Sequence, residues 1–134
     1  MYRLCFQRDF TARHFLVGGD WGPENQQHAH EYRLEWELRA PDLDRHGYLV
    51  DLIDVERALG AVLTRYEGAL LNDLPEFAGQ NPSLERFARA LWERLDGTLG
   101  APAAQAGAPA VRGAPASSVR LWENRQAWAS YEPW

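Results

Sequence analysis

Two histidines, His28 and His30, are the residues of this sequence whose types and spacing best suit a metal ion. They begin a stretch, residues 28–38, in which the even positions after His30 are aromatic or aliphatic and the odd ones are charged. This two-residue period predicts a half-buried strand. Because alternate side chains of a strand share one face, both imidazoles are expected to project from its dry face. The pattern predicts a pair of metal ligands at the start of a strand.

His14 is the candidate for a third ligand. It falls on the apolar parity at the end of another alternating segment that begins at Tyr2. A single histidine on an apolar face is more often a hydrogen-bonded core residue than a ligand, but three on predicted dry faces favour a metal site. Three imidazoles with an open fourth position are typical of catalytic zinc, whereas structural zinc usually has four ligands rich in Cys. The lone Cys5 cannot supply such a set.

Composition limits the classes of function. With 134 residues, 46% hydrophobic and 25% charged, the chain is expected to be one soluble domain, residues 1–134. The net charge of −5 argues against nucleic acid as a partner. No apolar run approaches the ~20 residues of a membrane span, and the first segment is too charged for a signal peptide, so we expect a cytoplasmic protein. All fourteen basic residues are Arg, which excludes lysine chemistry.

The remaining pattern predicts an α+β fold. Strands are expected at residues 2–15, 28–40, 48–53 and 119–123, and helices from a cap at Asp54 and from 81–83 onward. Residues 97–118 are rich in Gly, Ala and Pro and are expected to form a flexible insertion, and residues 128–134 can add a short strand. His46 falls in a polar turn and is expected to be solvated. We therefore predict a four-stranded antiparallel sheet with two helices on one face, whose open edges favour oligomerisation.

The motifs, in order, resemble those of the 6-pyruvoyl-tetrahydropterin synthase and 6-carboxytetrahydropterin synthase family. They are Phe10-Thr11-Ala12-Arg13-His14, His28-Ala29-His30-Glu31-Tyr32, Gly47-Tyr48-Leu49-Val50-Asp51-Leu52, Leu71-Asn72, Asn81-Pro82-Ser83-Leu84-Glu85, and Leu121-Trp122-Glu123-Asn124 with Tyr131. The resemblance implies the tunnelling fold, in which strands of three chains close a barrel and two trimers form a homo-hexamer with active sites between subunits. It also implies zinc on His14, His28 and His30, and a pterin anchored by Glu123.

Two positions depart from the family pattern. The family uses a Cys shortly before His-x-His, assisted by an Asp-His pair, and this sequence has neither. Glu24 stands where one branch carries its Cys, and some family members carry Glu in that role. Glu67 stands at the Asp position, but the following His is replaced by Gly68. Glu24 and Glu67 are thus the candidate catalytic residues, since a carboxylate near zinc can act as a base.

Two main functions remain open at this point. The first is a zinc-dependent carbon–oxygen lyase of the 6-pyruvoyl-tetrahydropterin synthase type, acting on a dihydropterin such as dihydroneopterin triphosphate, with Glu24 as the base. The second is a zinc-containing pterin- or purine-binding protein that has lost its acid–base residues. A zinc hydrolase for another heterocycle is a weaker third. Triphosphate release, measured against simple pterin binding, separates the first two.

Overall fold

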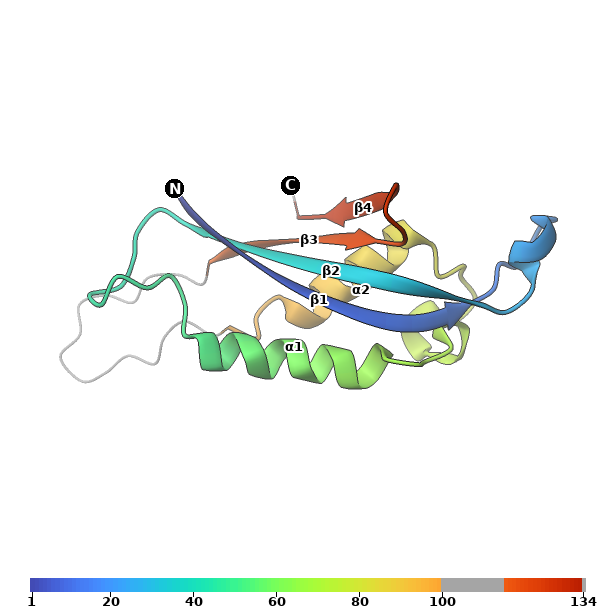
Figure 1. The fold of residues 1–134 in the computed structure, drawn as a ribbon, viewed down its shortest axis with the longest axis horizontal. Helices are drawn as coiled ribbons and strands as arrows, with labels where there is room; N and C mark the ends of the chain where they lie inside the picture. The colour runs from blue at the N-terminus through green and yellow to red at the C-terminus, as the bar shows by residue number, and fades with distance from the viewer. Residues whose placement is uncertain (100–114, 134) are drawn as a thin grey trace.

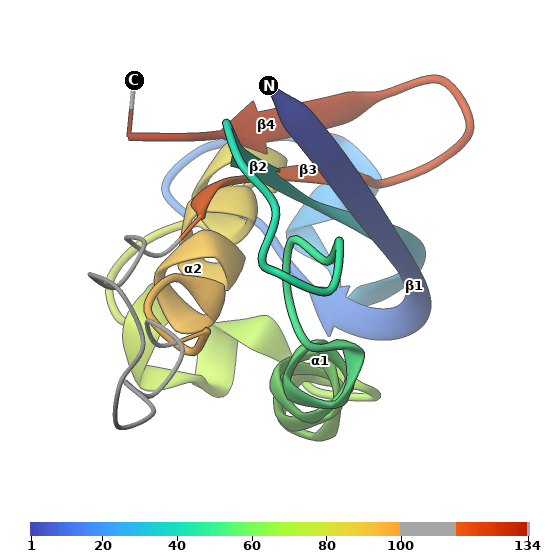
Figure 2. The same cartoon turned by 90° about the vertical axis from the view of Figure 1, so that its left-hand side faces the viewer.

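The computed structural model describes residues 1–99 and 115–133, which form two layers, one of strands and one of helices. In chain order the elements are β1 (Tyr2–His14), η1 (Gly22–Asn25), β2 (His28–Ala40), α1 (Leu52–Tyr66), η2 (Leu71–Asp73), η3 (Pro75–Phe77), α2 (Leu84–Leu95), β3 (Ala116–Trp122) and β4 (Trp128–Tyr131). The strands form one antiparallel sheet in the order β1-β2-β3-β4. Both helices lie beneath the same face of it (Figures 1 and 2). The predicted α+β class and four-stranded sheet are confirmed.

The core lies between this sheet face and the two helices. Alternate residues of β2 point into it, and Tyr32, Leu34, Trp36 and Leu38 are each at most 2% exposed. Phe87 of α2 stands at its centre, with ring centroids 5.0 to 5.8 Å from four aromatic rings, those of Phe10, Tyr32, Tyr66 and Phe77. The two-residue period of residues 30–38 is therefore the period of burial, as the sequence predicted.

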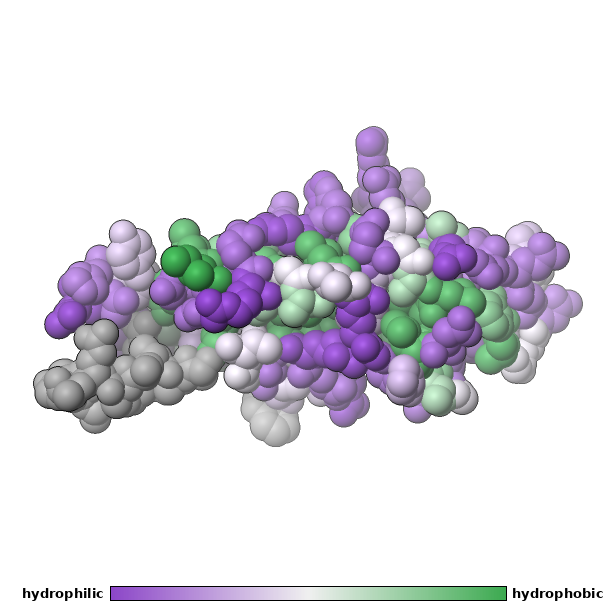
Figure 3. All heavy atoms as spheres, turned by 90° about the horizontal axis from the view of Figure 1, so that it is seen from below, coloured by the Kyte–Doolittle hydropathy of each residue, from purple (hydrophilic) through white to green (hydrophobic). Residues whose placement is uncertain are grey.

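The prediction of a strand at residues 48–53 is wrong. The carboxylate of Asp44 accepts the amides of His46 and Tyr48, which makes this segment a turn, and Asp51 then caps α1 by accepting the amide of Ile53. The helix therefore begins at Leu52, before the predicted cap at Asp54. Leu52 and Ile53 fall on its solvent side, where they are 56% and 68% exposed. The surface below the sheet is mainly hydrophilic, with separate apolar areas (Figure 3).

The fourth strand comes instead from the end of the chain. β4 pairs with β3, so the order is two strands, two helices and two strands rather than three strands, two helices and one. Of the predicted flexible segment, residues 116–118 belong to β3, and residues 100–114 lie outside the described part of the chain. Within residues 1–99 and 115–133, no helix combines the length and apolarity needed to cross a membrane.

The loop between β1 and β2 carries η1 beyond the sheet at one end of the molecule (Figure 1). β1 is an edge strand of the sheet, and the outer side of its end, at Thr11 and Arg13, bonds to residues 68–70 and forms an isolated bridge with Leu70. Its last residue, His14, is paired with the first residue of β2, His28. This end of the β1–β2 ladder is where the candidate site lies.

Candidate metal centre

Three histidines meet where β1 ends and β2 begins. His14 is directly opposite His28 in the antiparallel register, and His30 is opposite Ala12, so all three project from the helix-facing side. Their ring centroids are 4.5 to 4.9 Å apart. One ligand atom from each lies within 4.8 Å of the others, close enough for the cluster to hold a metal ion. The structure thus brings together the three residues that the sequence proposed.

Two backbone carbonyls set the direction of two of the rings. Nδ1 of His14 is 3.0 Å from the carbonyl oxygen of Pro82, and Nδ1 of His28 is 2.8 Å from that of Gln26. A carbonyl oxygen can only accept, so each Nδ1 donates and each Nε2 keeps its lone pair. The Nε2 atoms of His28 and His30 are buried without a hydrogen-bond partner. A buried lone pair without a donor is costly, and a metal ion would satisfy it, so these residues fit a metal.

The electrostatics of the cluster favour the form of histidine that binds metals. Burial lowers the pKa of His14 below its usual value, and the nearby His28 and His30 lower it further, although the Pro82 carbonyl acts in the opposite direction. Burial likewise lowers the pKa of His30, partly opposed by the charges of Glu123 and Glu24. Both rings are therefore neutral near neutral pH, which is the state needed for coordination.

Glu123 lies beside the histidines, just after β3. One of its carboxylate oxygens is 3.0 Å from Nε2 of His30. This is a close approach to a neutral ring rather than a hydrogen bond, because the nitrogen has no hydrogen-bond partner. The carboxylate also acts on Tyr32, whose pKa is raised mainly by burial and further by the charge of Glu123. Glu123 is thus at the edge of the cluster, partly open to solvent.

The two candidate catalytic carboxylates differ in their relation to the cluster. Glu24 lies on η1 and is exposed, and its charge raises the pKa of His30, so it stands within electrostatic reach of the histidines. Glu67 is the C-cap residue of α1 and accepts a hydrogen bond from the backbone amide of Thr11 at 3.0 Å, where Gly68 and Ala69 also bond to the outer side of β1. Within one chain Glu24 belongs to the neighbourhood of the histidines, whereas Glu67 supports the edge of the sheet.

A family model described as 6-pyruvoyl tetrahydropterin synthase matches residues 3–133. The chain belongs to this family. Its fold is that of solved synthases, with a TM-score of 0.78 to the Caenorhabditis elegans enzyme at 21% identity, covering 100% of this chain and 98% of that one. The family assignment predicted from the motifs is confirmed, as is the tunnelling fold at the level of a single chain, a four-stranded antiparallel sheet with two helices.

Two Plasmodium synthases share the fold at lower identity. The P. falciparum enzyme has a TM-score of 0.76 at 11% identity, covering 99% of this chain and 98% of that one. The P. vivax enzyme has a TM-score of 0.73 at 14% identity, covering 97% and 96%. It was solved as a variant in which its catalytic residue, a glutamate, is replaced by cysteine.

Several residues that support the site of this 6-pyruvoyl tetrahydropterin synthase family member were missed by the sequence reasoning. The carbonyls of Pro82 and Gln26 orient two histidines, and the side-chain amides of Asn72 and Asn81 hold the chain after His14. The sequence predicts Asn81 and Pro82 as the start of a helix and as part of a family motif, but not as supports of the site. The available signal was the preference of asparagine for bonding to nearby backbone in turns, which does not by itself say which segment is held.

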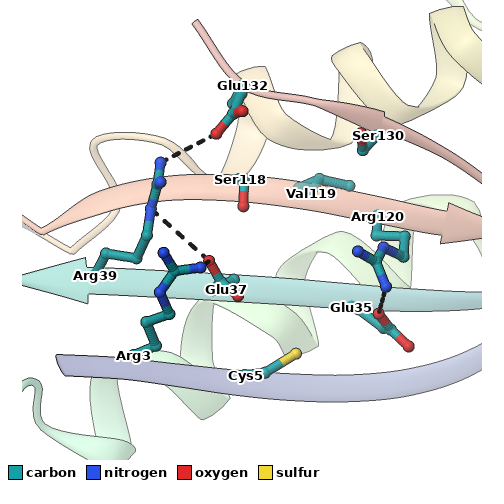
Figure 4. Close-up of a pocket in the computed structure, with 10 residues that line it drawn as sticks. All are labelled: Arg3, Cys5, Glu35, Glu37, Arg39, Ser118, Val119, Arg120, Ser130 and Glu132. Atoms are coloured by element: carbon teal, nitrogen blue, oxygen red, sulfur yellow. Dashed lines mark hydrogen bonds and ion pairs between the residues drawn. The ribbon is translucent and has the colours of Figure 1, made fainter. Parts of the chain in front are cut away.

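A separate groove of about 380 Å³ lies on the opposite face of the sheet. Both positively and negatively charged side chains line it. The lining residues are Arg3, Cys5, Glu35, Glu37, Arg39, Ser118, Val119, Arg120, Ser130 and Glu132 (Figure 4). Its charges are paired, as between Arg39 and Glu132 at 3.1 Å and between Arg120 and Glu35 at 3.7 Å. None of the three histidines lines it, so this groove is not the metal centre.

Proposed function

We propose that this family member is a zinc-dependent 6-pyruvoyl tetrahydropterin synthase-like lyase that acts on a dihydropterin of the dihydroneopterin triphosphate class. The observation that carries the proposal is the group of three imidazoles with the Glu123 carboxylate beside it and the charge of Glu24 acting on His30. Such a combination offers a metal, a base and an anchor for a polar heterocycle within one small space. Membership of the family supports the same chemistry.

Each part of the site has a proposed role. His14, His28 and His30 hold the zinc, which when bound polarises an oxygen of the substrate side chain. Glu24 takes protons from the substrate and returns them as the carbon–oxygen bond to triphosphate breaks. Glu123 accepts the 2-amino and ring N–H groups of the pterin, a pair that a carboxylate matches with its two oxygens. The glutamate named as catalytic in the P. vivax enzyme supports a glutamate in this role.

Assembly into a homo-hexamer of two trimers is part of the proposal. β1 and β4 are the outer strands of the described sheet, and the backbone groups of their outer edges, apart from those of Thr11 and Arg13 that bond to residues 68–70, can pair with other copies. Glu67 lies on the side of the β1 edge, where it would face a neighbouring chain. We propose that it assists the acid–base chemistry of the neighbour's site, in the position of the family aspartate.

A second candidate function is a zinc-containing pterin- or purine-binding protein without catalysis. It is favoured by one observation, the presence of Gly68 where the family carries its catalytic histidine. This function would need the histidines and Glu123 but not Glu24.

Incubation of zinc-loaded protein with dihydroneopterin triphosphate separates the two functions. The lyase releases inorganic triphosphate, which phosphorus NMR detects, and the reaction is lost when zinc is removed by a chelator. The binding protein instead changes pterin fluorescence on titration and releases no triphosphate. If neither triphosphate release nor pterin binding is observed, both functions are refuted.

A further inference from the structure

The turn formed by Asn81 and Pro82 is anchored to α2. Ser83 caps this helix by accepting the amide of Arg86 at 3.2 Å, and the Arg86 guanidinium donates to the carbonyl of Asn81 at 3.3 Å. Phe87, one residue further on, is fully buried in the core. The turn therefore stands on an element that is held firmly against the sheet.

The turn, which is anchored to α2 in this way, contacts the chain segment that follows β1. The Pro82 carbonyl accepts from Nδ1 of His14 at 3.0 Å, in a buried setting. The Asn81 side chain pairs with both backbone groups of Val17: its oxygen accepts the Val17 amide at 2.7 Å and its nitrogen donates to the Val17 carbonyl at 3.1 Å. The Asn81 side chain thus satisfies both backbone groups of Val17, as a neighbouring strand would, at a point where β1 has already ended.

A second set of hydrogen bonds connects the segment after β1 to Glu24. The Leu16 amide donates to the carbonyl of Glu24 at 2.8 Å, and Asn25 donates from its side chain to the carbonyls of Leu16 and Gly19, both at 3.0 Å. Asn81 therefore holds Val17, and the adjacent Leu16 holds the backbone of Glu24. Both the ligand His14 and the carboxylate Glu24 are connected to one turn.

We propose that the Asn81–Pro82 turn is a shared positioning element, which fixes the direction of His14 for the metal through Pro82 and the place of Glu24 through Asn81. The part that concerns Glu24 rests on the proposed lyase function, whereas the part that concerns His14 requires only metal binding. A hydrogen bond to the far nitrogen of a ligating histidine typically changes metal affinity or activity by about 10- to 100-fold. A turn that carries both contacts couples metal affinity to the placement of the base.

The experiment compares Asn81→Ala with Asn25→Ala and with a control, Asp44→Ala. Asp44 also accepts two backbone amides in a turn, those of His46 and Tyr48, but it follows the other end of β2. Zinc affinity is measured by competition with a chelator, the cobalt-substituted protein is followed by its absorption bands, and the protection of the Leu16 amide is measured by hydrogen exchange. Asn81→Ala removes both hydrogen bonds between the turn and Val17 but leaves the Pro82 carbonyl in the chain, so we expect the turn to shift, zinc binding to weaken by up to about 10-fold and the cobalt bands to change.

The two loop variants are expected to separate the two roles. Both Asn81→Ala and Asn25→Ala should speed exchange of the Leu16 amide and lower kcat with little change in KM, but only Asn81→Ala should weaken zinc binding. Asn81→Ser retains one hydrogen-bonding group and should be intermediate, and it replaces Asn81→Ala if that variant does not fold. Zinc affinity of the Asn81 variants equal to that of Asp44→Ala would overturn the proposal. Absence of turnover in the wild type would refute the lyase function alone, because zinc affinity and exchange still decide the role of the turn.

Discussion

Glu123 lies against His30, with one carboxylate oxygen of Glu123 3.0 Å from Nε2 of His30. Their side chains are similarly accessible, at 25% and 23% exposure. A heterocycle held by Glu123 would therefore lie against the histidine cluster rather than at a distance from it. Under the proposed function, recognition of the ring and the chemistry of its side chain would therefore take place next to each other, and the role of each residue can be tested separately.

Glu123→Gln should weaken pterin binding with little effect on folding or zinc content. Glutamine has the same shape, but one of its two acceptors becomes a donor that faces the N–H groups of the pterin. We expect affinity to fall about 30-fold, the equivalent of about 2 kcal/mol, in a fluorescence titration. Glu132→Gln, which alters a carboxylate on the opposite sheet face, is the matched control. Wild-type affinity in Glu123→Gln would show that another residue binds the ring.

Removal of a proposed metal ligand should remove the metal. His28→Ala and His30→Ala each leave two imidazoles, and metal analysis should find well under one zinc per chain after dialysis. His46→Ala is the control, because that ring is exposed in a turn and accepts a hydrogen bond from Arg45. Stoichiometric zinc of unchanged affinity in both ligand variants would exclude these residues from the site.

Glu24→Gln tests the base separately from the anchor. The amide cannot take up a proton at neutral pH, so turnover should fall by about 100-fold or more while pterin affinity is retained. The neighbouring carboxylate Glu31 is the control, since it lies on the outer face of β2 and Glu31→Gln should keep activity. If Glu24→Gln turns over as fast as the wild type, a different group moves the protons.

The state of assembly is a fourth prediction. Light scattering at micromolar concentration should give about six times the 15.3 kDa mass of one chain, because pairing of β1 and β4 edges between copies removes unpaired backbone groups from water. A mass near that of a single chain would contradict both the hexamer and the proposed contribution of Glu67 to a neighbouring site.

The parts of the structure that the sequence could predict are those encoded by side-chain periodicity. The alternation from His30 to Leu38 fixed which face is buried, and with it the side on which three histidines meet. The error at residues 48–53 arose because a short apolar run suits a strand or a helix start equally well. The structure has instead a turn closed by Asp44 and a helix start capped by Asp51.

The supports of the site could not be predicted in the same way. The Pro82 and Gln26 carbonyls that orient two histidines are backbone groups, which every residue carries. Their role depends on where the chain passes, not on residue type. Glu67 is the opposite case. The sequence suggested it as a catalytic residue because of its residue type, but its carboxylate accepts a hydrogen bond from the backbone amide of Thr11.

Away from the site, Glu76 joins both helices through a polar network. Its carboxylate accepts from Nε of Arg65 at 2.8 Å, the Tyr66 hydroxyl at 2.6 Å and Nε of Arg94 at 3.1 Å. These groups come from the last residues of α1, from η3 and from α2. The Arg65 hydrogen bonds are the largest cause that lowers the pKa of Glu76. Burial, and after it the hydrogen bond to Glu76, raises the pKa of Tyr66 to about 12.

Glu76→Gln should therefore change both the stability of the fold and its dependence on pH. A carboxyl whose pKa is lower in the folded state than its usual value of 4.5 stabilises the fold above that value, and this contribution is lost as pH falls below it. The wild type should thus lose free energy of unfolding on acidification more steeply than Glu76→Gln. At neutral pH the variant should be less stable by about 2 kcal/mol, since hydrogen bonds to a charged group are replaced by weaker ones.

Urea unfolding of the zinc-free protein between pH 3 and pH 7 measures both effects. The control is Glu93→Gln, whose partner Arg89 is exposed on α2, and it should follow the wild-type curve. Parallel curves for the wild type and Glu76→Gln would show that the carboxyl does not have a lowered pKa in the folded protein.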